Sequence, residues 1–150
     1  MAALFAFLHH VSAFVLFAAL VVEFVLLRGI LTVETARKIL RADMILGISA
    51  GVLLLVGLGR VFHFEKGALY YFQTRTFITK LGLFILIGLI SIIPTREFLR
   101  WRPALKAGQA PTVAPEKLKS IQHIIHAEMT GVVLILLMAA LMAKGIGVLV

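Results

Sequence analysis

The chain has 150 residues, of which 61% are hydrophobic and 15% are charged. Soluble domains are much less apolar, so the composition predicts an integral membrane protein. The chain contains no cysteine, which excludes disulfides, thiolate metal sites and cysteine nucleophiles. The formal net charge is +8, but the basic residues lie in short segments between apolar runs. There they act as topology signals and contact membrane lipid, so we expect no nucleic-acid partner.

Four apolar runs follow one another along the chain. A helix rises about 1.5 Å per residue and needs about 20 residues to cross a hydrocarbon core of about 30 Å. The sequence therefore predicts one all-α domain, 1–150, a bundle of four transmembrane helices at approximately 4–27, 44–62, 77–93 and 124–143. Pro94 is expected to end or kink the third span, and the proline-containing segment after it is expected to be a polar linker.

Lysine and arginine are distributed unevenly around these runs. Ten of the fifteen lie between spans one and two or between spans three and four, and both segments fall on the same side of a four-span protein. The positive-inside rule predicts that these segments are cytoplasmic and that both termini lie on the outer side. The first run lacks a preceding basic segment and a cleavage site, so we expect a span and not a removed signal peptide.

The first span carries three polar residues, His9, His10 and Glu23. At about 100° per residue, Glu23 lies within about 40° of His9 but about 140° from His10. A polar side chain in lipid is costly unless it has a partner or a role. We therefore expect the face with His9, Ser12 and Glu23 to point into the bundle and His10 to face lipid or the membrane interface.

Each of the other spans also carries a polar residue at the head of an apolar stripe. These residues are Asp43 on the second span, Lys80 on the third and Glu128 on the fourth. Histidines and cations thus gather in the outer half of the bundle, and the carboxylates of Glu23, Asp43 and Glu128 gather in the inner half. These acids are candidates to accept protons from a substrate; the alternatives are an ion-pair cluster with Arg41 or hydrogen-bonded buried acids.

An inward-facing histidine with wide apolar walls and small residues opposite is the arrangement that a b-type haem requires. His9 is the candidate ligand of the haem iron, and His10 is the weaker candidate. Lys80 is a second axial ligand if it is neutral, or a partner of a haem propionate if it is charged. Further cations for the propionates are available at the outer membrane surface: Arg60, Lys66 and Arg75.

Simpler roles remain open for the same residues. His9 could be a hydrogen-bonded bridge between helices. Lys80 could extend to the outer headgroups.

Three segments carry a resemblance to known membrane protein families: FLHHVSAFV, TKLGLFILIG and IIHAEMTGVVLI. Together with the run from Arg60 to Trp101, they resemble a bacterial family of small membrane proteins of unknown function. That family is similar to the HemJ-type membrane protoporphyrinogen oxidases and distantly to CopD-like copper-resistance domains. His9, Lys80 and Glu128 match the first-helix histidine, third-helix lysine and last-helix glutamate of the HemJ type.

The resemblance implies haem binding through the histidine and the lysine. It also implies oxidation of protoporphyrinogen, with electrons passed to a membrane acceptor, in the bacterial cytoplasmic (inner) membrane. Lys80, Glu128 and Glu23 are then the candidate catalytic residues. The HemJ type has a further histidine on its third helix, where this chain reads LISIIPT. We therefore carry over haem ligation and leave the enzyme activity open.

Three classes of function follow from these observations. The first is a haem-binding redox protein that meets a porphyrin or quinone-like molecule in the membrane. The second is a CopD-like metal transporter, which is disfavoured because the spans lack the methionine and histidine ladder that Cu(I) prefers. The third is an accessory membrane subunit whose polar residues only hold helices together. Four helices enclose a cofactor tightly, so a homo-oligomer that shares the site is compatible with each class.

Overall fold

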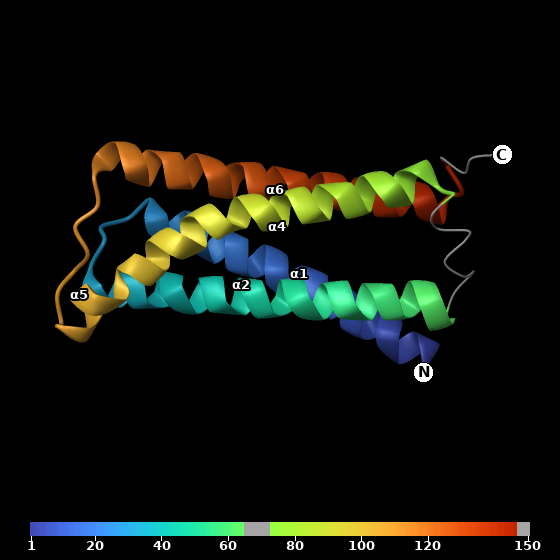
Figure 1. Ribbon diagram of the computed structural model, residues 1–150, viewed down its shortest axis with the longest axis horizontal. Helices are drawn as coiled ribbons and strands as arrows, with labels where there is room; N and C mark the ends of the chain where they lie inside the picture. The colour runs from blue at the N-terminus through green and yellow to red at the C-terminus, as the bar shows by residue number, and fades with distance from the viewer. Residues whose placement is uncertain (65–72, 147–150) are drawn as a thin grey trace.

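A computed structural model describes residues 1–64 and 73–146 as a bundle of helices (Figure 1). The helices are α1 (Ala2–Leu27), α2 (Val33–Gly59) with a π-helical turn η1 (Arg60–Phe64), α4 (Arg75–Arg100), α5 (Arg102–Lys106) and α6 (Pro115–Ala143). Within the described residues, four helices are long and apolar enough to cross a membrane. This confirms the predicted all-α bundle with four transmembrane helices.

The helix ends follow from local sequence signals. At the start of α2, the Thr32 hydroxyl accepts a hydrogen bond from the Thr35 amide at 3.1 Å, which satisfies a backbone donor that has no partner within the helix. The negative charge of Glu34 in the first turn interacts favourably with the helix dipole. Its carboxylate also pairs with Nζ of Lys38 at 2.7 Å. α6 begins at Pro115, a position where the missing amide of proline is not needed.

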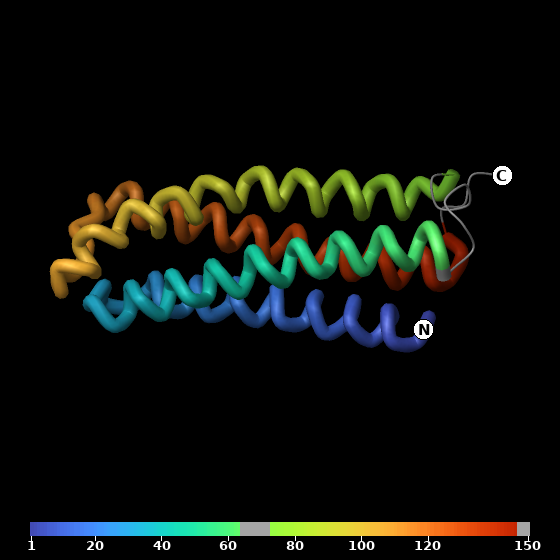
Figure 2. Tube along the Cα trace, turned by 60° about the horizontal axis from the view of Figure 1, so that its bottom comes forward, coloured from blue at the N-terminus to red at the C-terminus, as the bar shows by residue number. Residues whose placement is uncertain are grey.

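The helices form two antiparallel hairpins, because α1 packs mainly on α2 and α4 packs mainly on α6 (Figures 1 and 2). We name the end that holds α5 and the connections 28–32 and 107–114 the loop end. The opposite end, where α1 begins and α6 ends, is the terminal end (Figure 2). The first residues of α1 and the last residues of α6 thus lie at the same end of the bundle (Figure 2). Which side of the membrane this end faces stays a prediction.

The apolar core is concentrated toward the loop end. Its largest side chains are almost completely buried and come from all four long helices: Leu27, Ile39, Phe98, Ile121 and Ile125. Two long-range hydrogen bonds close this end. Arg37 of α2 donates to the Leu105 carbonyl at 3.2 Å, and Gln122 of α6 donates to the Leu27 carbonyl at 2.7 Å.

Two details differ from the expected spans. α4 continues through Pro94 to Arg100, beyond the expected limit at residue 93, because packing against neighbouring helices compensates for the one backbone donor that proline lacks. α2 begins at Val33, so Arg37, Lys38 and Arg41 lie on its first turns. The connection between the first two spans is therefore shorter than the basic segment suggested.

Candidate functional site

Four helices line a cavity of about 450 Å³ at the terminal end of the bundle. This volume lies within the range of about 300–1,000 Å³ that is typical of small-molecule sites. The polar lining consists of His9 and His10 from α1, Arg60 from η1 and Lys80 from α4. The walls between them are apolar and come from α2, α4 and α6: Leu53, Leu58, Phe84, Ile135, Ala139 and Met142. The cavity therefore gathers four of the residues that the sequence singled out.

His9 is half-buried and lies directly against α2. A Cβ atom on Gly57 would stand 3.2 Å from Cε1 and 3.4 Å from Nδ1 of the imidazole. Since this is tighter than most packed contacts, the absence of a side chain at Gly57 is what allows α2 to approach the ring. A residue without a side chain on α2 thus lies opposite His9.

His10 lines the same cavity although its side chain is exposed. Its Nδ1 donates to the Ala6 carbonyl at 2.6 Å, and its ring stands edge-on to that of His9, with 6.1 Å between the centroids. Helical phase turned His10 away from the bundle, but the cavity is wide enough at this end to include its edge. His10 is thus both exposed and adjacent to the candidate ligand.

Of the four candidate cations, two line the cavity, one does not, and one lies outside the described residues. Lys80 is half-exposed, and its Nζ lies 5.4 Å from the centroid of the Phe77 ring, a geometry that favours a charged ammonium. Arg60 lines the cavity beside it. Arg75 is exposed at the first residue of α4 and is not part of the lining. Lys66 lies outside the described residues.

Three acids lie in the interior, on the loop-end side of the cavity. Glu23 of α1 is 0% exposed, Asp43 of α2 is 8% exposed and Glu128 of α6 is 2% exposed. They are close enough for Glu23 to interact electrostatically with both of the others, and Glu128 with Asp43. We name these three residues the carboxyl layer. The helical faces inferred from the sequence therefore converge on one level of the bundle.

The hydrogen bonding of the carboxyl layer is uneven. The Thr95 hydroxyl of α4 donates to Oδ1 of Asp43 at 2.6 Å. Within the described part of the chain, no oxygen of Glu23 or Glu128 has a hydrogen-bond partner, although the Ser91 hydroxyl faces Glu128. No group of three or more metal-ligating side chains is found among residues 1–64 and 73–146. The layer thus contains two carboxyls without a donor.

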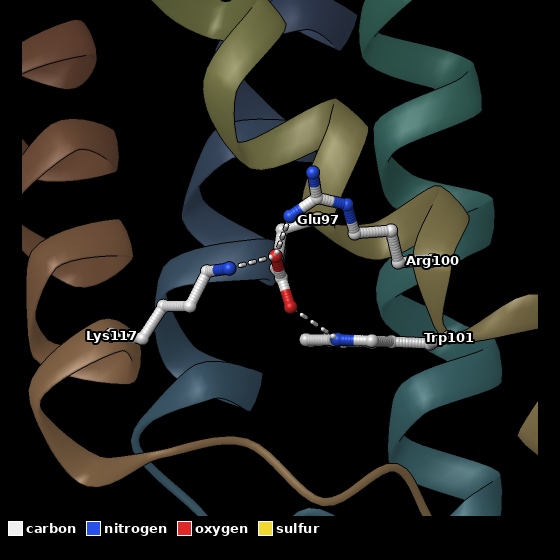
Figure 3. Close-up of polar contacts among 4 residues, drawn as sticks. All are labelled: Glu97, Arg100, Trp101 and Lys117. Atoms are coloured by element: carbon white, nitrogen blue, oxygen red, sulfur yellow. Dashed lines mark hydrogen bonds and ion pairs between the residues drawn. The ribbon is translucent and has the colours of Figure 1, made fainter.

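A fourth acid, Glu97, forms a cluster at the loop end that the sequence analysis missed (Figure 3). Its Oε2 lies 2.6 Å from Nζ of Lys117 and 3.4 Å from Nη1 of Arg100. Its Oε1 accepts a hydrogen bond from the Trp101 indole at 3.3 Å. The spacing of three and four residues predicts the contacts with Arg100 and Trp101. Lys117 could not be found in this way, because it belongs to another helix.

The fold and the site define an all-helical membrane protein of four spans, with a largely apolar cavity at one end and three buried acids on the loop-end side of it. The chain belongs to the family described as "Predicted membrane protein (DUF2214)", whose model matches residues 1–147. This confirms the coarser part of the resemblance, to a membrane protein family without an assigned activity. Searches of curated proteins and of solved structures gave no match. The likeness to the HemJ type and to CopD-like domains stays a prediction.

Proposed function

We propose that the protein binds a b-type haem in the terminal-end cavity and acts as a membrane redox protein of HemJ-like kind. The observation that carries the proposal is the cavity lining. It combines a half-buried imidazole, two cationic side chains and otherwise apolar walls within about 450 Å³. Histidine ligation with an apolar slot, and cations for two propionates, are the needs of a b-type haem.

The orientation of His9 supports its role as the iron ligand. The ring packs against Gly57 on α2 through Cε1 and Nδ1 and also lines the cavity, so α2 would hold the imidazole beside a ligand there. The neighbouring walls from α4 and α6, Phe84, Ile135 and Ala139, exclude water from a flat apolar ring. Arg60 and Lys80 would be the partners of the propionates, since both line the same cavity.

A haem in this position supplies one-electron transfer, and the protein residues hold and orient it. The partner would be an apolar small molecule of the membrane, either a porphyrinogen with its carboxylates or a quinone-like acceptor. Oxidation of a porphyrinogen is the reaction that the HemJ resemblance implies. In that reaction electrons would pass to a membrane acceptor, and the acids of the carboxyl layer are candidates to exchange protons.

A reduced-minus-oxidised absorption spectrum of the purified protein tests the proposal. We expect a Soret band in the wild type and in His10→Ala, and its loss in His9→Ala while helicity is retained. His10→Ala is the matched control, because both rings line one cavity. A wild type that is colourless and does not bind added haemin contradicts the proposal. Copper uptake into vesicles by such a protein would favour the transport alternative, and no effect of haemin on stability would favour an accessory subunit.

Lys80 has two possible roles that a pair of substitutions separates. We propose the propionate partner, because the position of Nζ over the Phe77 ring favours the charged form. Arginine keeps the charge but does not ligate iron in this way, so Lys80→Arg should leave the spectrum unchanged. Lys80→Met should weaken haemin binding and leave the band positions in place. A shift of the bands in both variants would instead assign Lys80 as an axial ligand.

A further inference from the structure

The carboxyl layer is a second polar site, separate from the cavity. Each acid comes from a different helix, and α4 adds the hydroxyls of Thr95 and Ser91. None of the three acids lines the cavity. All three are buried, and the four oxygens of Glu23 and Glu128 are inaccessible. An acid is rarely kept in such a place without a partner or a role.

No cation in the described part of the chain compensates these acids. On α1, the Arg28 guanidinium lies 4.7 Å from the centroid of the Phe24 ring. On α6, the His126 ring packs against the ring of the same phenylalanine, with 5.8 Å between the two centroids. Arg41, the sequence-based candidate for an ion pair, is exposed on α2. Within residues 1–64 and 73–146, the groups that face Glu23 are therefore the other two acids.

Three negative carboxylates cannot be stable together in the buried interior of the bundle. The effective penalty for burying one carboxylate is several kcal/mol, and neighbouring carboxylates repel one another. The Thr95 hydroxyl donates to Asp43 and stabilises a negative charge there, whereas the oxygens of Glu23 and Glu128 have no hydrogen-bond partner in the described residues, although the Ser91 hydroxyl faces Glu128. A metal ion would relieve the repulsion, but the described residues offer no group of three ligands with suitable placement.

The remaining ligand is the proton. We infer that the carboxyl layer is a proton-binding site, in which Glu23 and Glu128 are carboxylic acids at neutral pH and Asp43 carries the negative charge. This inference does not depend on the proposed haem, because it uses no residue of the cavity. It gives the bundle an internal site that can take up or release protons, on the loop-end side of the candidate redox site.

Infrared spectroscopy of the full chain in lipid nanodiscs at neutral pH tests this inference. We expect a carbonyl band of protonated carboxylic acid that shifts in D₂O, with separate parts of the band lost in Glu23→Gln and in Glu128→Gln. Glutamine is close in shape to a protonated glutamic acid, so both variants should fold. The matched controls are Glu34→Gln and Glu97→Gln, since these acids pair with lysines at 2.7 Å and 2.6 Å. Neither control should change the band.

Three results would overturn the inference. The first is a wild type without a carboxylic-acid band at neutral pH, which decides the question even if the variants do not fold. The second is a band that neither glutamine variant alters. The third is a band that disappears when Na⁺ is added at constant pH, because the layer would then be a cation site. A wild type that shows the band but binds no haem would keep this inference and reject the proposed function.

Discussion

At the loop end of the bundle, Phe98, Ile121 and Ile125 are at most 2% exposed. At the terminal end, the same helices leave a cavity of about 450 Å³ between them. The loop end also ties α1 to α6 and α2 to α5 through side-chain hydrogen bonds to backbone carbonyls. Close packing and open space are therefore separated along the long axis of the bundle: one end holds the two hairpins together, and the other leaves a cavity between them.

The acids of the two regions differ in the same way. Glu97 at the loop end receives three donors from Arg100, Trp101 and Lys117 (Figure 3). Glu23 and Glu128, deeper in the bundle, receive none within the described residues. A buried acid with donors on both oxygens stabilises the helices that supply them. A buried acid without donors does not stabilise the fold in this way, which is the contrast on which the inferred proton-binding site is based.

The largest expected effect comes from truncating the core at the loop end. Phe98→Ala removes a completely buried ring and should lower the free energy of unfolding by about 3–5 kcal/mol. Leu99→Ala is the control, because Leu99 is exposed on the outer surface of the bundle. Denaturation in mixed micelles measures both. Equal losses in the two variants would mean that the loop end is not the packed region.

The second-largest effect on stability is expected where α4 packs closely against α6. A Cβ on Gly131 would stand 2.5 Å and 2.9 Å from two side-chain carbons of Ile87, so Gly131→Ala should destabilise the bundle by about 1–3 kcal/mol. A Cβ on Gly88 meets nothing within 4 Å. Gly88→Ala should therefore be neutral or stabilise by up to about 1 kcal/mol. Thermal unfolding that ranks the two variants in the opposite order would refute this packing.

The Glu97 cluster should contribute less than the core. Glu97→Gln weakens the pair with Lys117 and the bond from Trp101, and we expect a loss of about 1 kcal/mol. Glu34→Gln is the matched control, since it breaks only the exposed pair with Lys38, which solvent screens, so it should cost less than Glu97→Gln. Unfolding of both variants at low and high salt provides the measurement. If the two losses are equal, the cluster is only a surface ion pair.

The smallest change in stability, but a specific change in binding, is expected beside His9. Gly57→Ala places a Cβ 3.2 Å from Cε1 of the imidazole, so the ring must move by a few tenths of an ångström. Haemin affinity should fall while the free energy of unfolding changes by less than about 1 kcal/mol. Gly47→Ala on the same helix is the control, because a Cβ there meets nothing within 4 Å. Equal haemin affinities in the two variants would mean that His9 is not part of the haemin-binding site.

Much of this arrangement could be predicted from the sequence, because helical phase is a local property. The spacing of His9, Ser12 and Glu23 placed them on one face, and that face is buried in the structure from Ser12 to Leu27. The partners across helices could not be predicted in this way. The bond from Thr95 to Asp43 joins residues 52 positions apart, and it depends on which helices are neighbours and at what level.

Two local expectations also lacked tertiary information. Proline lacks a backbone donor, which favours the end of a helix, yet α4 passes through Pro94, since the packing around a buried proline is not visible in the sequence. Helical phase predicted that His10 points away from the bundle. The structure shows that His10 nevertheless lines the cavity, whose width cannot be predicted from helical phase. Both differences arise from neighbours on other helices.

Rescue of a His9 variant by free imidazole tests whether His9 is the ligand of the haem iron. In His9→Gly, the space of the ring is vacated beside Gly57, and free imidazole can enter it. We predict that His9→Gly does not show the wild-type haem spectrum, that added imidazole restores this spectrum, and that His10→Gly needs no rescue. A wild-type spectrum in His9→Gly without imidazole would contradict His9 as the haem ligand.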